Sequence, residues 1–307
     1  MKKDLISIAQ LTKQEILEII SLAEKIKKNP ADYSTKLKDK TLLMIFEKPS
    51  LRTRISFEVG MTQMGGHAIY YDLANSPMGK KESVSDTAKT ASRYVDIIMA
   101  RLFSHQQIEE LAEYATVPVI NALTDFSHPC QILGDFLTIK EKKGRLENLK
   151  LTYLGDSNNN VTHSLIFGSA IVGLDIAIGC PADSKYLPQE SVLAKSKELD
   201  GREIKITDDP IEAIKDADVV YTDSWMSYHI PESEKEKRLA ALKHYQVTAE
   251  LMKSAKPDAI FMHCLPAQRG VEQTAEVIDG PQSVVFDQAE NRLHIQKAIM
   301  LKLLKAS

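Results

Sequence analysis

The 307-residue chain contains little cysteine and lacks the glycine-rich motifs of nucleotide-binding proteins. Its three cysteines, Cys130, Cys180 and Cys264, are far apart, which argues against a disulfide framework or a zinc site and suits a reducing compartment. Neither a phosphate-binding P-loop nor a G-x-G-x-x-G fingerprint is present, and Asp156-Ser157-Asn158 occupies a turn where a dehydrogenase would carry glycines. These absences argue against a nicotinamide-dependent dehydrogenase.

The sequence also lacks an excess of positive charge and a long uninterrupted apolar run. Its formal net charge is −3, so the whole molecule has no basic field with which to attract nucleic acid. Charged residues interrupt the opening segment, MKKDLISIAQLTKQE, and we therefore expect neither a signal peptide nor a membrane span. The composition predicts a cytoplasmic globular protein that binds any anion at a local site.

Short apolar runs rich in β-branched residues alternate with segments of helical periodicity. Near-continuous apolar strands between helices indicate parallel sheets covered on both faces, so the predicted fold class is α/β with two doubly wound domains. The expected strands are 41–47, 67–73, 95–101, 117–123, 149–156, 174–181, 218–223, 259–265 and 283–288.

The two series of strands are separated by a helical segment that becomes polar around Gly144. We therefore predict a first domain at 1–147 and a second at 148–288. A final helix within 289–307 is expected to pack back on the first domain, and an opening helix is expected at about 13–27.

The stretch EKPSLRTRISFEVG, at 47–60, places two hydroxyls and two arginines where a strand gives way to a helix. A helix start offers unpaired N–H groups, to which Ser50 and Thr53 add hydroxyls and Arg52 a planar fork of donors. Together these groups suit a phosphate. The alternative is that Ser50 merely caps the helix and that the arginines are solvated.

Further polar residues follow other predicted strands of the first half. Arg101 ends the apolar run VDIIMAR, and a charge at the end of a buried strand needs a partner. In SHPCQILGDF, Pro129 suits the first position of a helix, which places His128 at its cap and Gln131 in its first turn. Taken alone, a histidine at this position is more often a structural cap than a ligand.

The second half repeats this arrangement. Three asparagines, 158–160, follow one strand, Asp223 ends another, and Cys264 follows His263 at a third. Asparagines commonly fill tight turns, and a lone cysteine is commonly a small apolar filler. At strand ends, however, the amides could hold an amino-acid backbone, and the carboxylate of Asp223 could hold an ammonium group.

The order of these motifs is more specific than any one of them. S-x-R-T-R, an arginine, H-P-x-Q, G-D-x-N-N-N, D-x-x-x-S and H-C-L-P-A follow one another, and the sequence thereby resembles the aspartate/ornithine carbamoyltransferase family over essentially its whole length. HCLPA at 263–267 and AENR at 289–292 resemble the ornithine-specific branch, since the aspartate branch reads H-P-L-P.

The resemblance implies transfer of the carbamoyl group of carbamoyl phosphate to the δ-amine of L-ornithine, giving citrulline and phosphate, as in arginine biosynthesis. It implies no metal or organic cofactor. It also implies a homotrimer in which the loop Ser76–Gly79 reaches the neighbouring site. Arg101, His128 and Cys264 would be catalytic. The residues assigned to carbamoyl phosphate are Ser50, Leu51, Arg52, Thr53, Arg101, His128, Gln131, Cys264, Leu265 and Arg292. Those assigned to ornithine are Asn160, Asp223, Ser227 and Tyr228.

The sequence departs from the family pattern at three places. Leu51 replaces a threonine, Pro77 stands where the loop usually carries glutamine, and Tyr228-His229 follow Ser227 where the family reads Met-Gly. The last change lies beside the second substrate, so the sequence leaves another amine, putrescine or an N-acylated ornithine, open as the acceptor.

Overall fold

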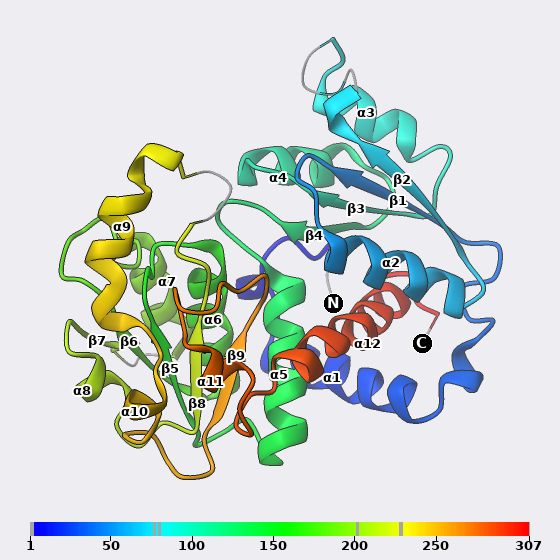
Figure 1. Ribbon diagram of the computed structural model, residues 1–307. Coiled ribbons are helices and arrows are strands. Elements are labelled where there is room, and N and C mark those ends of the chain that lie inside the picture. The colour runs from blue at the N-terminus through cyan, green and yellow to red at the C-terminus, as the bar shows by residue number, and fades with distance from the viewer. Residues whose placement is uncertain (1–2, 76–77, 79–80, 201–202, 227–229, 307) are drawn as a thin grey trace. The chain divides into compact units, whose positions relative to one another are not determined.

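The structure, a computed structural model, describes residues 3–75, 78, 81–200, 203–226 and 230–306. The chain divides into two compact units, of which the first comprises Met1–Leu137 with Glu290–Ser307 and the second Thr138–Ala289. Each unit contains one parallel sheet flanked by helices, which confirms the predicted fold class (Figure 1).

The first unit has a four-stranded sheet in the order β2-β1-β3-β4. Its strands are β1 (Thr41–Phe46), β2 (His67–Asp72), β3 (Ile97–Arg101) and β4 (Val119–Leu123). Its helices are α1 (Lys13–Lys28), α2 (Leu51–Gln63), α3 (Val84–Ala91), α4 (His105–Tyr114), the first part of α5 (Pro129–Lys143) and most of α12 (Val285–Leu303). Short 3-10 turns lie at Ile8–Gln10, Pro30–Tyr33 and Leu73–Asn75.

The C-terminal helix α12 packs on the helices of the first unit, as predicted. Figure 1 shows α12 beside α1 and α2. A Cβ added to Gly60 of α2 would lie 3.4 Å from the Met300 side chain, and Lys302 pairs with Glu18 of α1 at 2.7 Å. Helix α1 starts at a capping box formed by Thr12 and Glu15, which satisfies N–H groups of its first turn.

The second unit has a five-stranded sheet in the order β7-β6-β5-β8-β9. Its strands are β5 (Lys150–Leu154), β6 (Asp175–Gly179), β7 (Lys205–Thr207), β8 (Val219–Thr222) and β9 (Ile260–His263). Its helices are α6 (Asn160–Val172), α7 (Glu190–Asp200), α8 (Pro210–Ile214), α9 (Lys235–Leu242), α10 (Ala249–Met252) and α11 (Ala275–Ile278), with 3-10 turns at Glu232–Glu234 and Lys243–Tyr245.

One predicted strand is wrong. Residues 283–288 form a single bridge, from Ser283 to Phe261, and helix α12 then begins at Val285. The sequence SVVF suggests a strand because it contains two adjacent valines, both of which are buried. Val285, however, is the first residue of α12 and packs in the core of the second unit. The short strand β7 was missed because its three residues include an exposed lysine.

The order of the strands identifies the edge where each unit can form a site. In the first unit the chain builds outward from β1 to β2 and then returns to β3 and β4; in the second it runs from β5 to β6 and β7 and then returns to β8 and β9. Ligands of open α/β sheets bind beyond the carboxyl ends of the strands where the order reverses. These are β1 and β3 in one unit, and β5 and β8 in the other.

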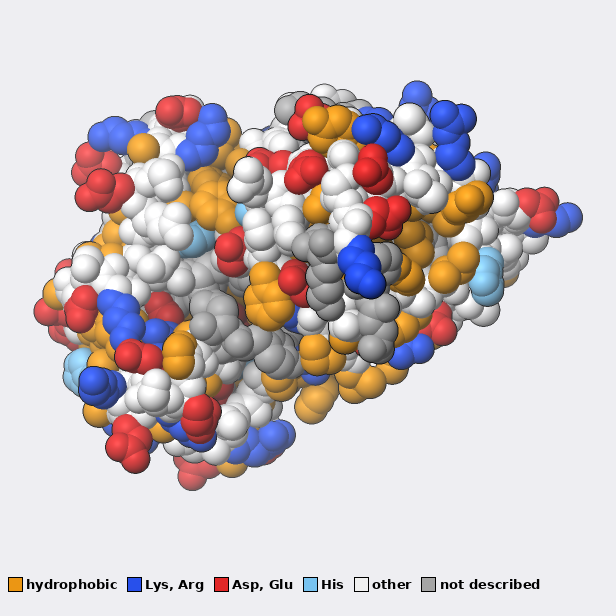
Figure 2. Space-filling model, turned by 90° about the horizontal axis from the view of Figure 1, so that it is seen from above, with side chains coloured by type: hydrophobic (Ala, Val, Ile, Leu, Met, Phe, Trp, Pro, Cys, Tyr) orange, Lys and Arg blue, Asp and Glu red, His pale blue; other side chains and the backbone are white. Residues whose placement is uncertain are grey.

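The surface carries both signs of charge. In Figure 2, acidic and basic side chains are interspersed over the visible face, as expected for a chain with a net charge of −3. Among the described residues, no helix is both long and apolar enough to cross a membrane.

Candidate active site

The predicted anion site of the first unit forms at the carboxyl ends of β1 and β3. Ser50 is the N-cap of α2: its hydroxyl accepts the Thr53 N–H at 3.3 Å and donates to the Thr53 hydroxyl at 3.0 Å. Arg101, opposite Phe46 in the β1–β3 register, donates from Nη1 to the same Thr53 hydroxyl at 3.5 Å. Two segments 48 residues apart in sequence thus meet at one helix start.

The helix start keeps donors for a ligand. Among the described residues, neither the N–H of Leu51 and Arg52 nor the Arg52 guanidinium has a hydrogen-bond or ion-pair partner. Leu51 is 70% exposed, so its side chain adds nothing to the cradle and only its backbone can serve. Arg54 differs, because it pairs with Glu58 at 3.3 Å and stacks over Tyr70.

His128, Gln131 and Arg292 lie together beside Arg101. His128 precedes α5 and is 4% exposed; burial, followed by the charges of Arg292 and Arg101, lowers the pKa of its imidazole well below the ordinary value. The ring is therefore neutral at physiological pH. Gln131 donates to Asp135 at 2.8 Å and accepts from Arg292 of α12, so the returning helix contributes a cation to this site.

In the second unit the asparagine-rich turn caps α6. Asn159 accepts the N–H groups of Val161 and Thr162, each at 2.9 Å, and its amide donates to the Tyr153 hydroxyl. Asn159 thus performs the structural role that turns give to asparagine. Asn160, which the family pattern predicts to contact ornithine, is the first residue of α6 and is half-buried.

Asp223 and Cys264 meet at the ends of β8 and β9. The Cys264 thiol donates to Oδ1 of Asp223 at 2.9 Å, and the N–H of Ser224 reaches the same oxygen at 2.7 Å. Leu265 has a φ of 58° and donates its N–H to Nδ1 of His263 at 2.9 Å, which fixes the chain just after the thiol. The lone cysteine is therefore no apolar filler, because it is half-exposed and bonded to a carboxylate.

A buried cation supports the segment that carries Asp223. Arg238 of α9 pairs with Asp156, which follows β5, and donates from Nε to the carbonyl of Trp225 at 3.0 Å. Gly155 permits the close packing: its φ is 123°, and a Cβ there would lie 2.9 Å from Nε1 of Trp225. The β5 turn and the segment after β8 are thus joined by one side chain.

Some of the predicted site residues lie outside the described residues, and two buried charged residues near the site were not predicted from the sequence. Ser227 and Tyr228 lie outside the described residues, as does the loop Ser76–Gly79 apart from Met78. Lys48 and Glu272 are 4% and 1% exposed and lie near the two sets of site residues. Nothing in the sequence pattern distinguishes Lys48 and Glu272 from solvated charges, because burial in the folded protein is what shifts their pKa values.

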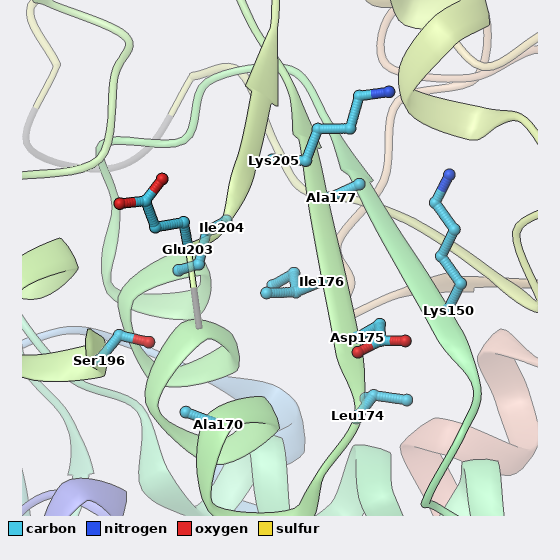
Figure 3. Close-up of a pocket in the computed structure, with 10 residues that line it drawn as sticks. All are labelled: Lys150, Ala170, Leu174, Asp175, Ile176, Ala177, Ser196, Glu203, Ile204 and Lys205. Atoms are coloured by element: carbon cyan, nitrogen blue, oxygen red, sulfur yellow. The ribbon is translucent and has the colours of Figure 1, made fainter. Parts of the chain in front are cut away.

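Another cavity of the second unit lies at the opposite edge of its sheet. It has a volume of 220 Å³ and is lined by the first residues of β5, β6 and β7, namely Lys150, Asp175 and Lys205, with Ser196 and Ala170 from helices α7 and α6 (Figure 3). Because these are amino ends of strands, we do not assign the active site to this cavity.

One group of described residues has the composition of a metal site. The ligand atoms of Asp223, His263 and Cys264 lie within 4.8 Å of one another. The thiol–carboxylate hydrogen bond and the Leu265 N–H on His263 already account for this arrangement. The absence of a required metal remains a prediction from the sequence.

Comparison with known proteins identifies the family. The carbamoyl-phosphate-binding domain of aspartate/ornithine carbamoyltransferases matches residues 3–141, and the aspartate/ornithine-binding domain of the same enzymes matches residues 147–303. The chain belongs to the aspartate/ornithine carbamoyltransferase family. The candidate anion site of the first unit therefore lies in the carbamoyl-phosphate-binding domain, and the Asp223–Cys264 pair lies in the aspartate/ornithine-binding domain.

Members of the family similar to this chain include several ornithine carbamoyltransferases. The enzyme of Methanosarcina acetivorans is 52% identical over 99% of this chain and 100% of its own length, and that of Bacillus subtilis is 50% identical over 98% and 94%. The structure of the Pyrococcus furiosus enzyme has a TM-score of 0.92 at 48% identity, covering 97% of this chain and 96% of that one. The Giardia lamblia enzyme has a TM-score of 0.90 at 43% identity, covering 99% and 98%.

Proposed function

We propose that this protein transfers the carbamoyl group of carbamoyl phosphate to the δ-amine of L-ornithine, releasing L-citrulline and phosphate. The observation that carries the proposal is the hydrogen bond from Cys264, in H-C-L-P-A, to Asp223, which follows β8 in the domain that takes the amino acid. Relatives named ornithine carbamoyltransferase, aligned over nearly the whole chain, support the same acceptor.

The phosphate would be held by the start of α2. The N–H groups of Leu51 and Arg52, the partial positive charge of the helix and the Arg52 guanidinium all suit a dianion. Ser50 and Thr53 would add hydroxyl donors once the ligand replaces their mutual hydrogen bond. Arg292 and Gln131, already paired, would border the carbamoyl group. The family pattern assigns Cys264 and Leu265 to the same ligand.

The proposed reaction moves an acyl group from a phosphate oxygen to a nitrogen. The δ-nitrogen lone pair attacks the carbonyl carbon, the C–N bond forms, and the bond from carbon to the bridging oxygen breaks with its electron pair leaving on phosphate. Negative charge grows on the carbonyl oxygen, where Arg101, Thr53 and the neutral His128 can donate hydrogen bonds. The nitrogen loses one proton overall.

The acceptor must arrive unprotonated or lose its proton in the site. An alkyl amine has a pKa of about 10.4, so about one molecule in 10³ is a free amine at pH 7. Cys264 would border the carbamoyl group that this amine attacks, and Asn160, Asp223 and Ser227, with Tyr228 beside them, would hold the amino-acid end. In cells we propose a cytoplasmic homotrimer acting in arginine biosynthesis, with the loop Ser76–Gly79 completing the neighbouring site.

A parallel acceptor assay tests the proposal. The purified protein is supplied with carbamoyl phosphate and, separately, ornithine, putrescine, N-acetylornithine or aspartate, and both phosphate and the ureido product are measured. We expect ornithine to be preferred by kcat/KM. A preference for putrescine or N-acetylornithine would refute ornithine as acceptor, and absence of phosphate release with all four would refute carbamoyl transfer.

A further inference from the structure

Lys48 is a buried cation beside the proposed phosphate site. It lies between the end of β1 and the N-cap Ser50, and its side chain is 4% exposed. The neighbouring Glu47 fixes this segment to the end of β3, because its N–H donates to the Arg101 carbonyl at 2.9 Å and its carboxylate accepts the Phe103 N–H at 2.6 Å. Lys48 is therefore held at the strand edge that carries the anion site.

The surroundings of Lys48 do not favour its charge. Its Nζ lies 3.8 Å from the centroid of the Phe103 ring, and no carboxylate of a described residue pairs with it. Burial, followed by the positive charge of Arg101 on β3, lowers the pKa of the ammonium to about 8, although Asp125 after β4 and Glu47 act in the opposite direction. The cation–π contact with Phe103 offsets only part of the cost of burial.

We propose that Lys48 takes up a proton from solvent when a phosphate dianion binds at the start of α2, and that this protonation couples the affinity for carbamoyl phosphate to pH. The inference rests on the proposed function, since the dianion must occupy the Ser50–Thr53 helix start. In the empty site, burial and the positive charge of Arg101 favour the neutral amine of Lys48. A bound dianion reverses this balance and restores the ammonium.

The size of the effect follows from linkage. With a free pKa of about 8, roughly half of the molecules carry a neutral Lys48 at pH 8 and roughly nine tenths at pH 9. If the dianion restores the ordinary lysine pKa of about 10.4, affinity falls about fivefold between pH 8 and pH 9, and about 0.7 proton is taken up at pH 8.5. His128 titrates outside this window, because its pKa lies well below its ordinary value.

Titration calorimetry on the full chain tests the proposal, with phosphonoacetamide as the stable isostere of carbamoyl phosphate. The binding enthalpy at pH 8.5 is compared in two buffers of different ionisation enthalpy, which yields the number of protons taken up. We expect about 0.7 for the wild type and for the exposed-lysine control Lys38→Met. We expect none for Lys48→Met, and none for Lys48→Arg, which keeps its charge and should bind with an affinity that does not change between pH 8 and pH 9.

The outcomes separate this inference from the proposed function. Binding of the isostere by the wild type without proton uptake, or uptake that persists in Lys48→Met, would overturn the role of Lys48 and leave the anion site standing. Failure of the wild type to bind the isostere would overturn both. Because the proton count is made first on the wild type, the result does not depend on the folding of any variant.

Discussion

Replacement of Arg238 by methionine should destabilise the second unit by several kcal/mol. The Arg238 side chain is 4% exposed, pairs with the 10% exposed side chain of Asp156 and holds the Trp225 carbonyl at 3.0 Å. The substitution keeps most of the side-chain volume but leaves a buried carboxylate without its cation. Breaking one side of a buried ion pair costs about 3–5 kcal/mol. With a urea dependence of about 2 kcal/mol per molar, the unfolding midpoint should fall by roughly 1.5–2.5 M.

The assay is selective because the sequence contains one tryptophan, Trp225, which is bonded to the arginine in question. Its fluorescence during urea unfolding therefore follows the second unit. The matched control is Arg269→Met: Arg269 pairs with Asp279 at 2.6 Å, but both side chains are about half exposed, at 47% and 49%. An exposed pair contributes about 0–1 kcal/mol, so the midpoint should hardly move.

If the urea midpoint of Arg238→Met falls no further than that of Arg269→Met, burial does not make the Arg238–Asp156 pair more stabilising than an exposed pair, and the argument is refuted. A second substitution, Asp156→Asn, removes the orphaned charge and should recover part of the loss in the Arg238→Met background. If the double variant is as unstable as the sum of the two single variants, the contact is not a coupled pair.

Three further outcomes are expected. Arg52→Ala should lower kcat/KM by about 10²–10³ with the fold intact by circular dichroism, whereas Arg54→Ala, which loses a pair with Glu58 and a stacking contact with Tyr70, should retain most activity. Burial raises the pKa of Glu272 to about 7, so the stability from its bound proton is present at low pH and lost as pH rises to about 7. The free energy of unfolding of Glu272→Gln, relative to that of the wild type, should therefore rise by about 2–3 kcal/mol between pH 5 and pH 8. Chemical denaturation that finds the same difference at both pH values would contradict this. A thiol reagent should modify Cys264 before Cys130, whose pKa burial raises to about 12, and mass mapping that finds Cys130 first would contradict the assigned exposures.

The fold was accessible from the sequence because its signal is periodic. Apolar runs between helical segments predicted two covered parallel sheets, and the strand ends pointed to Arg101, Asp223 and Cys264. The failure at 283–288 has a local cause. The three-residue apolar run Val284–Phe286 at the start of a long helix has no period of its own, so its length alone could not distinguish a strand from the first turn of α12.

Residues of the candidate site were predictable where they lie at or just after the carboxyl end of a predicted strand. Ser50, Thr53 and Arg101 needed no tertiary information, because each follows or ends an apolar strand. The hydrogen bond from Arg101 to Thr53 was not predictable, since it depends on β1 and β3 being neighbours in the sheet and on their register. Sequence reasoning therefore names such residues before it can say which of them touch.

Lys48 and Glu272 show a different limit. Both are ordinary surface-type residues in the sequence, and neither lies at a position that a helical or strand period marks. Their pKa values move towards neutrality, to about 8 and about 7, chiefly because folding removes water from them. Each lies beside a part of the proposed site that must respond to charge: one beside the cradle for a dianion, the other near Asp223, which would hold the amino-acid end of ornithine. A group that is half-charged near physiological pH can respond to a ligand at little cost, and such groups are found by burial rather than by motif.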